Sequence, residues 1–358
     1  MTIIAALFLT LVGCSSEPDA GDSPPSDVTA PDAVSNSDSS SADPTSLDAD
    51  STLDQDGAEA SETTADAETS SGPDSSCIQA NIQVAEGAQV LPQTVLHLDG
   101  SQSGGDGSLI SAYEWTVEQP VNSVSSFSPN NAMATPTFVA NVVGEYTFKL
   151  TVWDEFGAPN CEPAVTVVTV QAAEGIHIEL LWTTAGDPDQ TNQGPEAGAD
   201  MDLHFAHWLA VGQGSDEKGE WNGWFDQPFD CFWFNSSPNW GNLDSMIQDD
   251  PGLDLDDTDG VGPEILNLSN PENTPSPDDR YRVGVHYWSD HGYGPSVPMV
   301  RIYISGTLAY SVVGPPMKSH TMWFVGEISW PDGELIPYEN SDGSPKVIQD
   351  YTNPFIPN

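Results

Sequence analysis

Apolar and polar residues alternate with a period of two along several segments of this chain, and that period predicts β-strands. The clearest segment is Gly144–Trp153, where Tyr146, Phe148, Leu150 and Val152 would share one face. A shorter segment, Ala164–Gln171, would be the last strand of the same unit. Short runs of Gly, Asn and Pro separate these segments, as in all-β sandwiches. Residues 77–172 are therefore predicted to form one β-sandwich.

Residues 173–358 continue the same pattern. Alternation or apolar runs occur at Ile176–Trp182, Tyr281–Trp288, Val300–Ile304 and His320–Ser329. No stretch combines a 3.6-residue apolar period with helix caps. The predicted fold class is therefore all-β, with a second β-sandwich after the first.

The first part of the chain lacks the apolar residues that a core needs. Residues 17–76 contain no Lys or Arg and sixteen Asp or Glu, and most of the rest are Ser, Ala, Thr, Pro and Gly. Such a composition cannot offset the entropy cost of ordering. We expect residues 14–76 to be a disordered acidic tether.

Charge excludes one class of partner. The formal net charge is −48, from 55 acidic and seven basic residues. Nucleic-acid binding depends on Lys and Arg that neutralise phosphates, so no nucleic-acid partner is expected. Direct adhesion to an anionic membrane surface is disfavoured for the same reason.

The N-terminus has the pattern of an export signal. Ile3–Val12 is an apolar run too short to cross a bilayer but long enough for the core of a signal peptide. The run ends in Leu11-Val12-Gly13-Cys14, which resembles the lipobox of bacterial lipoproteins. That resemblance implies a signal peptide over residues 1–13, lipidation at Cys14 and a membrane held through that lipid.

Two details bear on the lipoprotein prediction. Ser15 after the cysteine favours the outer membrane, facing the periplasm or the cell surface. No Lys or Arg precedes the apolar run, which leaves the true start codon open. The alternative is an ordinary signal peptide with a chance cysteine.

Three further cysteines remain for an oxidising compartment. Cys77 and Cys161 bracket the first predicted sandwich, and a disulfide between them could stabilise it by about 4 kcal/mol. Cys231 lies among aromatic residues and is expected to be a buried thiol.

Residues 77–172 also resemble a known family. Leu98–Ser103, Tyr113–Trp115 and Gly144–Asp154 are similar to motifs of the polycystic-kidney-disease (PKD) domain. The resemblance implies an immunoglobulin-like sandwich with Trp115 in its core, acting as a spacer or contact module without catalysis.

The second region has a weaker family resemblance. Asp200–His204, Asp254–Glu264 and Tyr281–Trp288 are similar in order and spacing to motifs of the YfaP-like family of exported bacterial domains. That resemblance implies a fold and an exported setting but no activity.

An acidic stretch provides the strongest candidate site. Seven carboxylates lie between Asp249 and Glu264 with no Lys or Arg among them. Such density favours a hard cation, because Ca²⁺ takes six to eight oxygen ligands. The predicted ligands are Asp200, Asp202, Asp257, Asp259 and Glu264. The spacing does not match an EF-hand, and a solvated acidic loop is the alternative.

Two other kinds of site are conceivable. Trp221 and Trp224 lie in a turn-rich segment and could stack on a sugar ring, with core packing as the alternative. Histidines 204, 207, 286 and 291 could suggest zinc, but H-E-x-x-H is absent and His-x-x-His suits a strand poorly, which favours surface histidines.

The common catalytic motifs are missing. The sequence has no Walker P-loop, no G-x-G-x-x-G after a strand and no G-x-S-x-G elbow. We therefore expect a non-catalytic, lipid-anchored binding or scaffolding protein of the cell envelope, stabilised by Ca²⁺. An envelope protein or a polysaccharide would be its partner. The alternatives are a carbohydrate-binding surface lipoprotein and a metal- or carboxylate-dependent hydrolase.

Overall fold

The computed structural model describes residues 77–351 and Phe355, except for residues 106, 174, 193–196, 213–222, 243 and 245. The described chain contains nineteen β-strands and no helix, which confirms the all-β prediction. Within this part of the chain, no helix has the length and apolarity needed to cross a membrane. The signal peptide, Cys14, the tether and Trp221 all lie outside the described residues.

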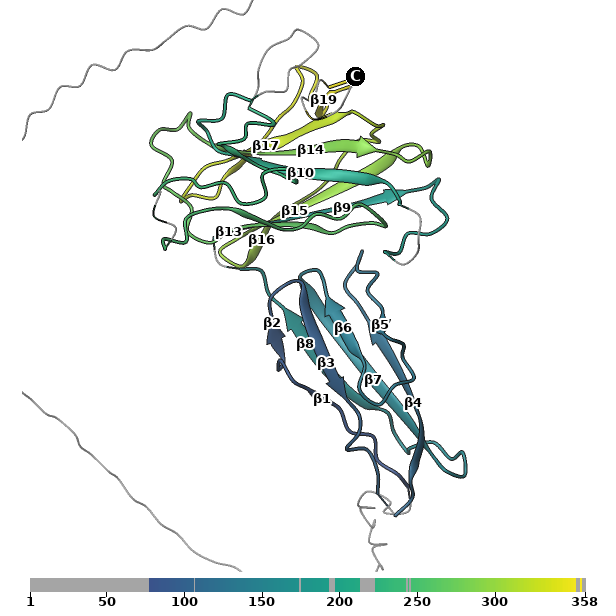
Figure 1. The fold of residues 1–358 in the computed structure, drawn as a ribbon. Coiled ribbons are helices and arrows are strands. Elements are labelled where there is room, and N and C mark those ends of the chain that lie inside the picture. Colours follow the sequence, from purple (N-terminus) through teal and green to yellow (C-terminus); the bar gives the residue numbers. More distant parts are fainter. Residues whose placement is uncertain are drawn as a thin grey trace, which may run out of the picture. The chain divides into compact units, whose positions relative to one another are not determined.

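The first sandwich consists of two four-stranded sheets (Figure 1). The first sheet has the order β1-β3-β6-β5, with β1 (Gln83–Val84), β3 (Thr94–Asp99), β6 (Thr137–Ala140) and β5 (Phe127–Ser128). The second has the order β2-β8-β7-β4, with β2 (Gln89–Val90), β8 (Ala164–Val170), β7 (Gly144–Asp154) and β4 (Ile110–Glu118).

The core of this sandwich follows the predicted alternation. Tyr146, Phe148, Leu150 and Val152 of β7 are all fully buried, as the period of two required. Trp115 of β4 is also fully buried, and its indole N–H donates a hydrogen bond of 2.9 Å to the carbonyl of Met133. Inward apolar side chains therefore hold the two sheets together.

The predicted disulfide is present. Cys77 and Cys161 are bonded, and their Cα atoms lie 6.0 Å apart. The bridge joins the start of the described chain to the turn before β8, so it closes a loop of 84 residues around the first sandwich.

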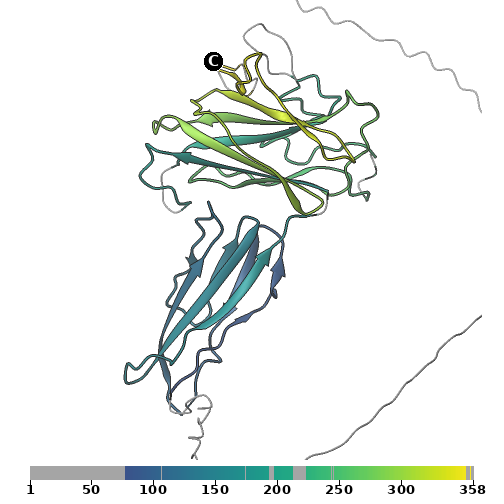
Figure 2. The ribbon, with the colours of Figure 1, turned by 180° about the vertical axis from the view of Figure 1, so that it is seen from behind.

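The second sandwich also has two sheets, which lie face to face in Figures 1 and 2. One has the order β11-β10-β14-β17-β18, with β19 also paired to β17; its strands are β11 (Asp230–Cys231), β10 (Asp200–Ala206), β14 (Tyr281–Ser289), β17 (Met322–Ile328), β18 (Leu335–Pro337) and β19 (Lys346–Ile348). The other has the order β12-β13-β9-β15-β16, with β12 (Gly252–Leu255), β13 (Glu264–Leu268), β9 (Ile176–Thr184), β15 (Ser296–Ile304) and β16 (Thr307–Val313).

Strand β10 is buried on both faces, although its alternating sequence suggested one exposed face. A second apolar cluster covers the outer face of its sheet and consists of Ala206, Ala210, Trp224, Phe225, Phe232, Met322, Phe324 and Tyr351. The aromatic segment after residue 222 therefore forms a third layer over β10, β14 and β17.

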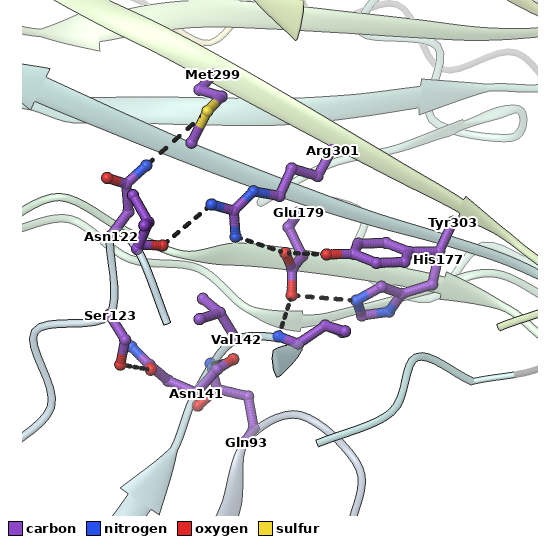
Figure 3. Close-up of polar contacts among 12 residues, drawn as sticks. Gln93, Asn122, Ser123, Asn141, Val142, His177, Glu179, Met299, Arg301 and Tyr303 are labelled. Atoms are coloured by element: carbon purple, nitrogen blue, oxygen red, sulfur yellow. Dashed lines mark hydrogen bonds and ion pairs between the residues drawn. The ribbon is translucent and has the colours of Figure 1, made fainter. Parts of the chain in front are cut away.

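Strand β9 is buried on both faces as well, and its charged side chain is paired (Figure 3). Glu179 is fully buried, and its carboxylate lies 3.5 Å from Arg301 and accepts a 3.3 Å hydrogen bond from the Tyr303 hydroxyl. It also accepts a 2.7 Å hydrogen bond from the backbone N–H of Val143, and His177 lies 3.6 Å away. These partners offset the desolvation of the carboxylate.

Candidate metal centre

The candidate centre lies where an edge of one sheet meets a loop of the other. Strand β10 provides Asp202, strand β13 provides Glu264, and the loop joining β12 to β13 provides Asp256. Each contributes a carboxylate oxygen, and these oxygens all lie within 4.8 Å of one another. Asp202 and Glu264 are buried and Asp256 is exposed, so the cluster has a floor inside the protein and one side open to solvent.

Local contacts hold the two buried carboxylates in place. Glu264 Oε2 accepts a 2.5 Å hydrogen bond from the backbone N–H of Leu203, which ties β13 to β10 across the sandwich. Asp202 Oδ2 lies 3.2 Å from Nδ1 of His286, the residue opposite it on β14. Each of these side chains therefore has one oxygen engaged by the protein and one left over.

Two buried oxygens at the cluster have no hydrogen-bond partner. Glu264 is completely buried, yet its Oε1 makes no hydrogen bond within the described chain. Asp200, two residues before Asp202 on the same strand, is 8% exposed, and its Oδ1 is also without a partner there. Buried acceptors without donors are costly and rare in folded proteins.

Burial dominates the electrostatics of the cluster. Desolvation raises the pKa of Asp202 to about 8, and it raises that of Glu264 well above its ordinary range, with the charge of Asp202 as the next cause. The pKa of Asp200 is also raised to about 8, first by burial and then by the charges of Asp202 and Asp256. The nearby imidazole does not compensate, because burial lowers the pKa of His286 well below its usual value and keeps the ring neutral.

Glycines shape the loop that provides Asp256. Gly262 has a φ of +81°, and a Cβ there would lie 2.8 Å from the carbonyl oxygen of Leu180. The neighbouring Val261 carbonyl accepts a 3.0 Å hydrogen bond from the N–H of Trp182 on β9. The loop is therefore attached closely to the second sheet just before Glu264 enters it.

Two of the predicted ligands face elsewhere. Asp257 accepts a 2.6 Å hydrogen bond from the side-chain amide of Asn192, and Asp259 accepts one of 2.8 Å from the N–H of Gly198. The clustered ligand set contains neither of them and includes Asp256, which sequence reasoning missed. Asp256, Asp257 and Asp259 are close in sequence, and their order alone does not show which one turns towards β10.

The predicted sugar-stacking residue Trp224 was wrong. Its side chain is fully buried, and its ring packs edge-on against Phe324 and His204. It belongs to the third layer over the sheet and cannot present a free face to a ligand.

The predicted surface position of the histidines was wrong for three of the four. His204 and His286 are fully buried and His207 nearly so, whereas His291 is exposed. His204 Nδ1 lies 2.7 Å from Asp230 Oδ2, and the His204 ring stacks on Phe232. Among the described residues, no histidine joins the carboxylate cluster, so the donor set consists of oxygens alone.

A small cavity opens on the exposed side of the cluster. It has a volume of about 150 Å³ and is lined by Asp200, Asp202, Trp233, Asp256, Thr258 and Trp288. The two indoles meet edge to face with their centroids 5.2 Å apart. Both tryptophans are half-buried, in contrast to Trp224.

Comparison with known families decides the identity of the first sandwich. A family model described as a PKD domain matches residues 85–170. Residues 85–170 are a PKD domain. The match confirms the predicted PKD resemblance and covers strands β2 to β8. No curated protein sequence matches the chain significantly.

Three solved structures overlap parts of the chain. The PKD domain of the KIAA 1837 protein is 28% identical and covers 27% of this chain and 93% of its own, with a TM-score of 0.22. A carbohydrate-binding module of the β-sandwich superfamily is 14% identical and covers 66% of this chain and all of its own, with a TM-score of 0.23.

The third structure is the adhesin InvE of Yersinia pseudotuberculosis, which is 9% identical and covers 76% of each chain, with a TM-score of 0.19. TM-scores this low support no functional conclusion. The lipoprotein and YfaP-like resemblances find no counterpart in these comparisons and stay predictions.

Proposed function

We propose that this chain is a non-catalytic binding or scaffolding protein of the cell envelope, held by a lipid at Cys14 and stabilised by one Ca²⁺ in its second sandwich. The observation that carries the calcium assignment is the unpartnered, fully buried Glu264 Oε1 in a group with Asp202 and Asp256. A cation there would supply the interaction that this oxygen lacks among the described residues.

The chemistry of the donors selects the ion. The three ligands are carboxylates, and oxygen-only sets favour hard cations over zinc or copper. Calcium accepts irregular sets of six to eight oxygens, whereas Mg²⁺ requires a near-ideal octahedron. Asp256 comes from a loop and Asp202 and Glu264 from two different sheets, an arrangement that suits the more permissive ion.

Export is supported by the cysteines. The Cys77–Cys161 disulfide suits an oxidising compartment outside the cytoplasm. This agrees with the apolar run and lipobox-like residues at the N-terminus, whose Cys14 would attach the protein to the outer membrane. The PKD domain would then act as a spacer between the tether and the second sandwich.

The test is a thermal melt of the full chain carrying Cys14→Ser, measured with Ca²⁺, with Mg²⁺ and with chelator. We expect a rise in Tm of several degrees that is specific to Ca²⁺, because ligand binding to the native state adds to its stability. Asp256→Asn should abolish the rise, whereas Asp278→Asn, an exposed aspartate outside the cluster, should keep it. Identical melts in calcium and in chelator would refute the calcium assignment.

A polysaccharide is the second candidate partner, beside an envelope protein. The observation that favours it is the pair of half-buried indoles, Trp233 and Trp288, beside the carboxylates.

A further inference from the structure

The cavity beside the carboxylate cluster joins two kinds of group that are rarely placed together without a ligand. Its acidic wall consists of Asp200, Asp202 and Asp256, and its other wall includes Trp233 and Trp288. Trp288 lies on β14 beyond His286, and Trp233 lies in the turn after β11. Two separate elements therefore bring apolar rings against a group of like charges.

Packing alone explains these indoles incompletely. Trp224, Phe225 and Phe232 already form the buried layer over the sheet, whereas Trp233 and Trp288 are only half-buried. The indole N–H of Trp233 is buried but has no acceptor within the described chain. The cavity thus carries an unsatisfied donor on one side and unsatisfied acceptors on the other.

An ion in the cluster would keep open positions on the cavity side. Asp202 Oδ2 is next to His286, and Glu264 Oε2 is bonded to the N–H of Leu203, so each of these residues has one oxygen free. Together with the two oxygens of Asp256 and the free Oδ1 of Asp200, the protein offers about five ligands to an ion that takes about six to eight. The remaining positions face the cavity, because Glu264 closes the opposite side.

We propose that this cavity is a carbohydrate subsite in which two adjacent hydroxyls of a neutral sugar ring complete the coordination of the bound Ca²⁺ while the indoles of Trp233 and Trp288 contact its C–H face. The inference rests on the proposed calcium site. Sugar hydroxyls are hard oxygen donors that replace water on the ion, and an aromatic face provides the apolar contact that a pyranose ring offers.

Size and charge narrow the ligand. A cavity of about 150 Å³ is well below the ~300–1,000 Å³ of drug-sized sites, so it would admit one ring of a longer chain. The formal charge of −48 on the whole chain repels anionic polymers, which favours a neutral glycan.

The experiment uses the full chain with Cys14→Ser on an array of neutral oligosaccharides whose terminal hexoses, deoxyhexoses and N-acetylhexosamines display adjacent hydroxyls. Binding is measured with Ca²⁺ and with chelator, and Tm is recorded for each variant under both conditions. We expect binding to at least one terminal sugar only with Ca²⁺. Trp288→Leu and Trp233→Leu should each weaken that binding by up to about tenfold while keeping the calcium-dependent rise in Tm.

Trp330→Leu is the matched control, since Trp330 is also half-buried in the second sandwich but does not line the cavity. It should leave binding unchanged. A calcium-dependent Tm with no bound sugar anywhere on the array would overturn the subsite and leave the calcium site standing. Equal binding in chelator, or full binding by both tryptophan variants, would also overturn it. If calcium changes neither Tm nor binding, both proposals fall.

Discussion

At the scale of single residues, the charge of Glu264 is the most informative feature of the molecule. Its side chain is completely buried with one oxygen unpartnered among the described residues, and burial raises its pKa well above the ordinary range. A carboxylate in this position opposes folding when no cation is bound. Its presence therefore makes sense as part of a site.

The substitution Glu264→Gln separates these two effects. In chelator, the variant should melt about 2–4 °C higher than the parent for each kcal/mol of charge burial that is relieved. With Ca²⁺, the variant should show no further rise, because a ligand is missing. Thermal melts in chelator and in Ca²⁺ measure both effects, and a calcium response that survives in the variant would place the ion elsewhere.

Cys231 is the second residue with a clear expectation. It is fully buried in the core of the second sandwich, and burial raises the pKa of its thiol well above the usual value. Because the thiolate is the reactive form, a thiol reagent should not react with the native Cys14→Ser protein and should label one site after denaturation. Rapid labelling of the native protein would show that this part of the core opens easily.

At the scale of elements, the aromatic segment over β10, β14 and β17 is a structural layer. Phe232 is fully buried, stacks on His204 and meets Phe225 edge to face. Phe232→Ala should therefore cost about 3–5 kcal/mol of unfolding free energy. Phe156→Ala is the matched control: this ring is 83% exposed on the first sandwich, so its loss should change stability by less than about 0.5 kcal/mol. Denaturant titration of the two variants measures the contrast, and similar losses for both would contradict the layer.

The disulfide makes a separate prediction for the PKD domain. Replacing Cys77 and Cys161 by Ser removes a cross-link that closes a loop of 84 residues. The chain-entropy model predicts a loss of about 4 kcal/mol from the first sandwich. Denaturant titration, followed through the buried Trp115, would measure it. An unchanged midpoint would mean that the sheet packing alone determines the stability of this unit.

The same elements show how far sequence patterns reach. Alternation in Gly144–Trp153 identified the inward face of β7 correctly, because one side of that strand packs in the core and the other does not. It failed for β10 and β9, whose polar faces are also covered. Their cover comes from segments distant in sequence, and a local period carries no information about it.

The candidate site was predicted in part for a related reason. Charge density pointed correctly to Glu264 and to Asp202, since buried like charges need a counter-charge wherever they lie. It could not choose Asp256 over its neighbours, because the turn that orients them depends on contacts with Asn192 and Gly198. Trp233 and Trp288 were missed because their positions beside the acids depend on strand pairing across the sheet.

At the scale of the whole molecule, the account joins a lipid anchor, an acidic tether, a PKD domain and a calcium-binding sandwich. The anchor can be tested separately, since Cys14 is the proposed lipid attachment site. We expect Cys14→Ser to move the protein from the membrane fraction to the soluble fraction of cells and to abolish incorporation of labelled palmitate. Retention in the membrane without label would point to an ordinary, uncleaved export signal.

The calcium ion is the claim on which the rest depends, and equilibrium dialysis against radioactive Ca²⁺ tests it most directly. The full chain with Cys14→Ser should bind one equivalent that excess Mg²⁺ does not displace. The additional substitution Asp256→Asn should bind none at the same free calcium, because that exposed side chain contributes ligands without being needed for the core. Equal binding by the parent and the Asp256→Asn variant, or no saturable binding by either, would contradict the account.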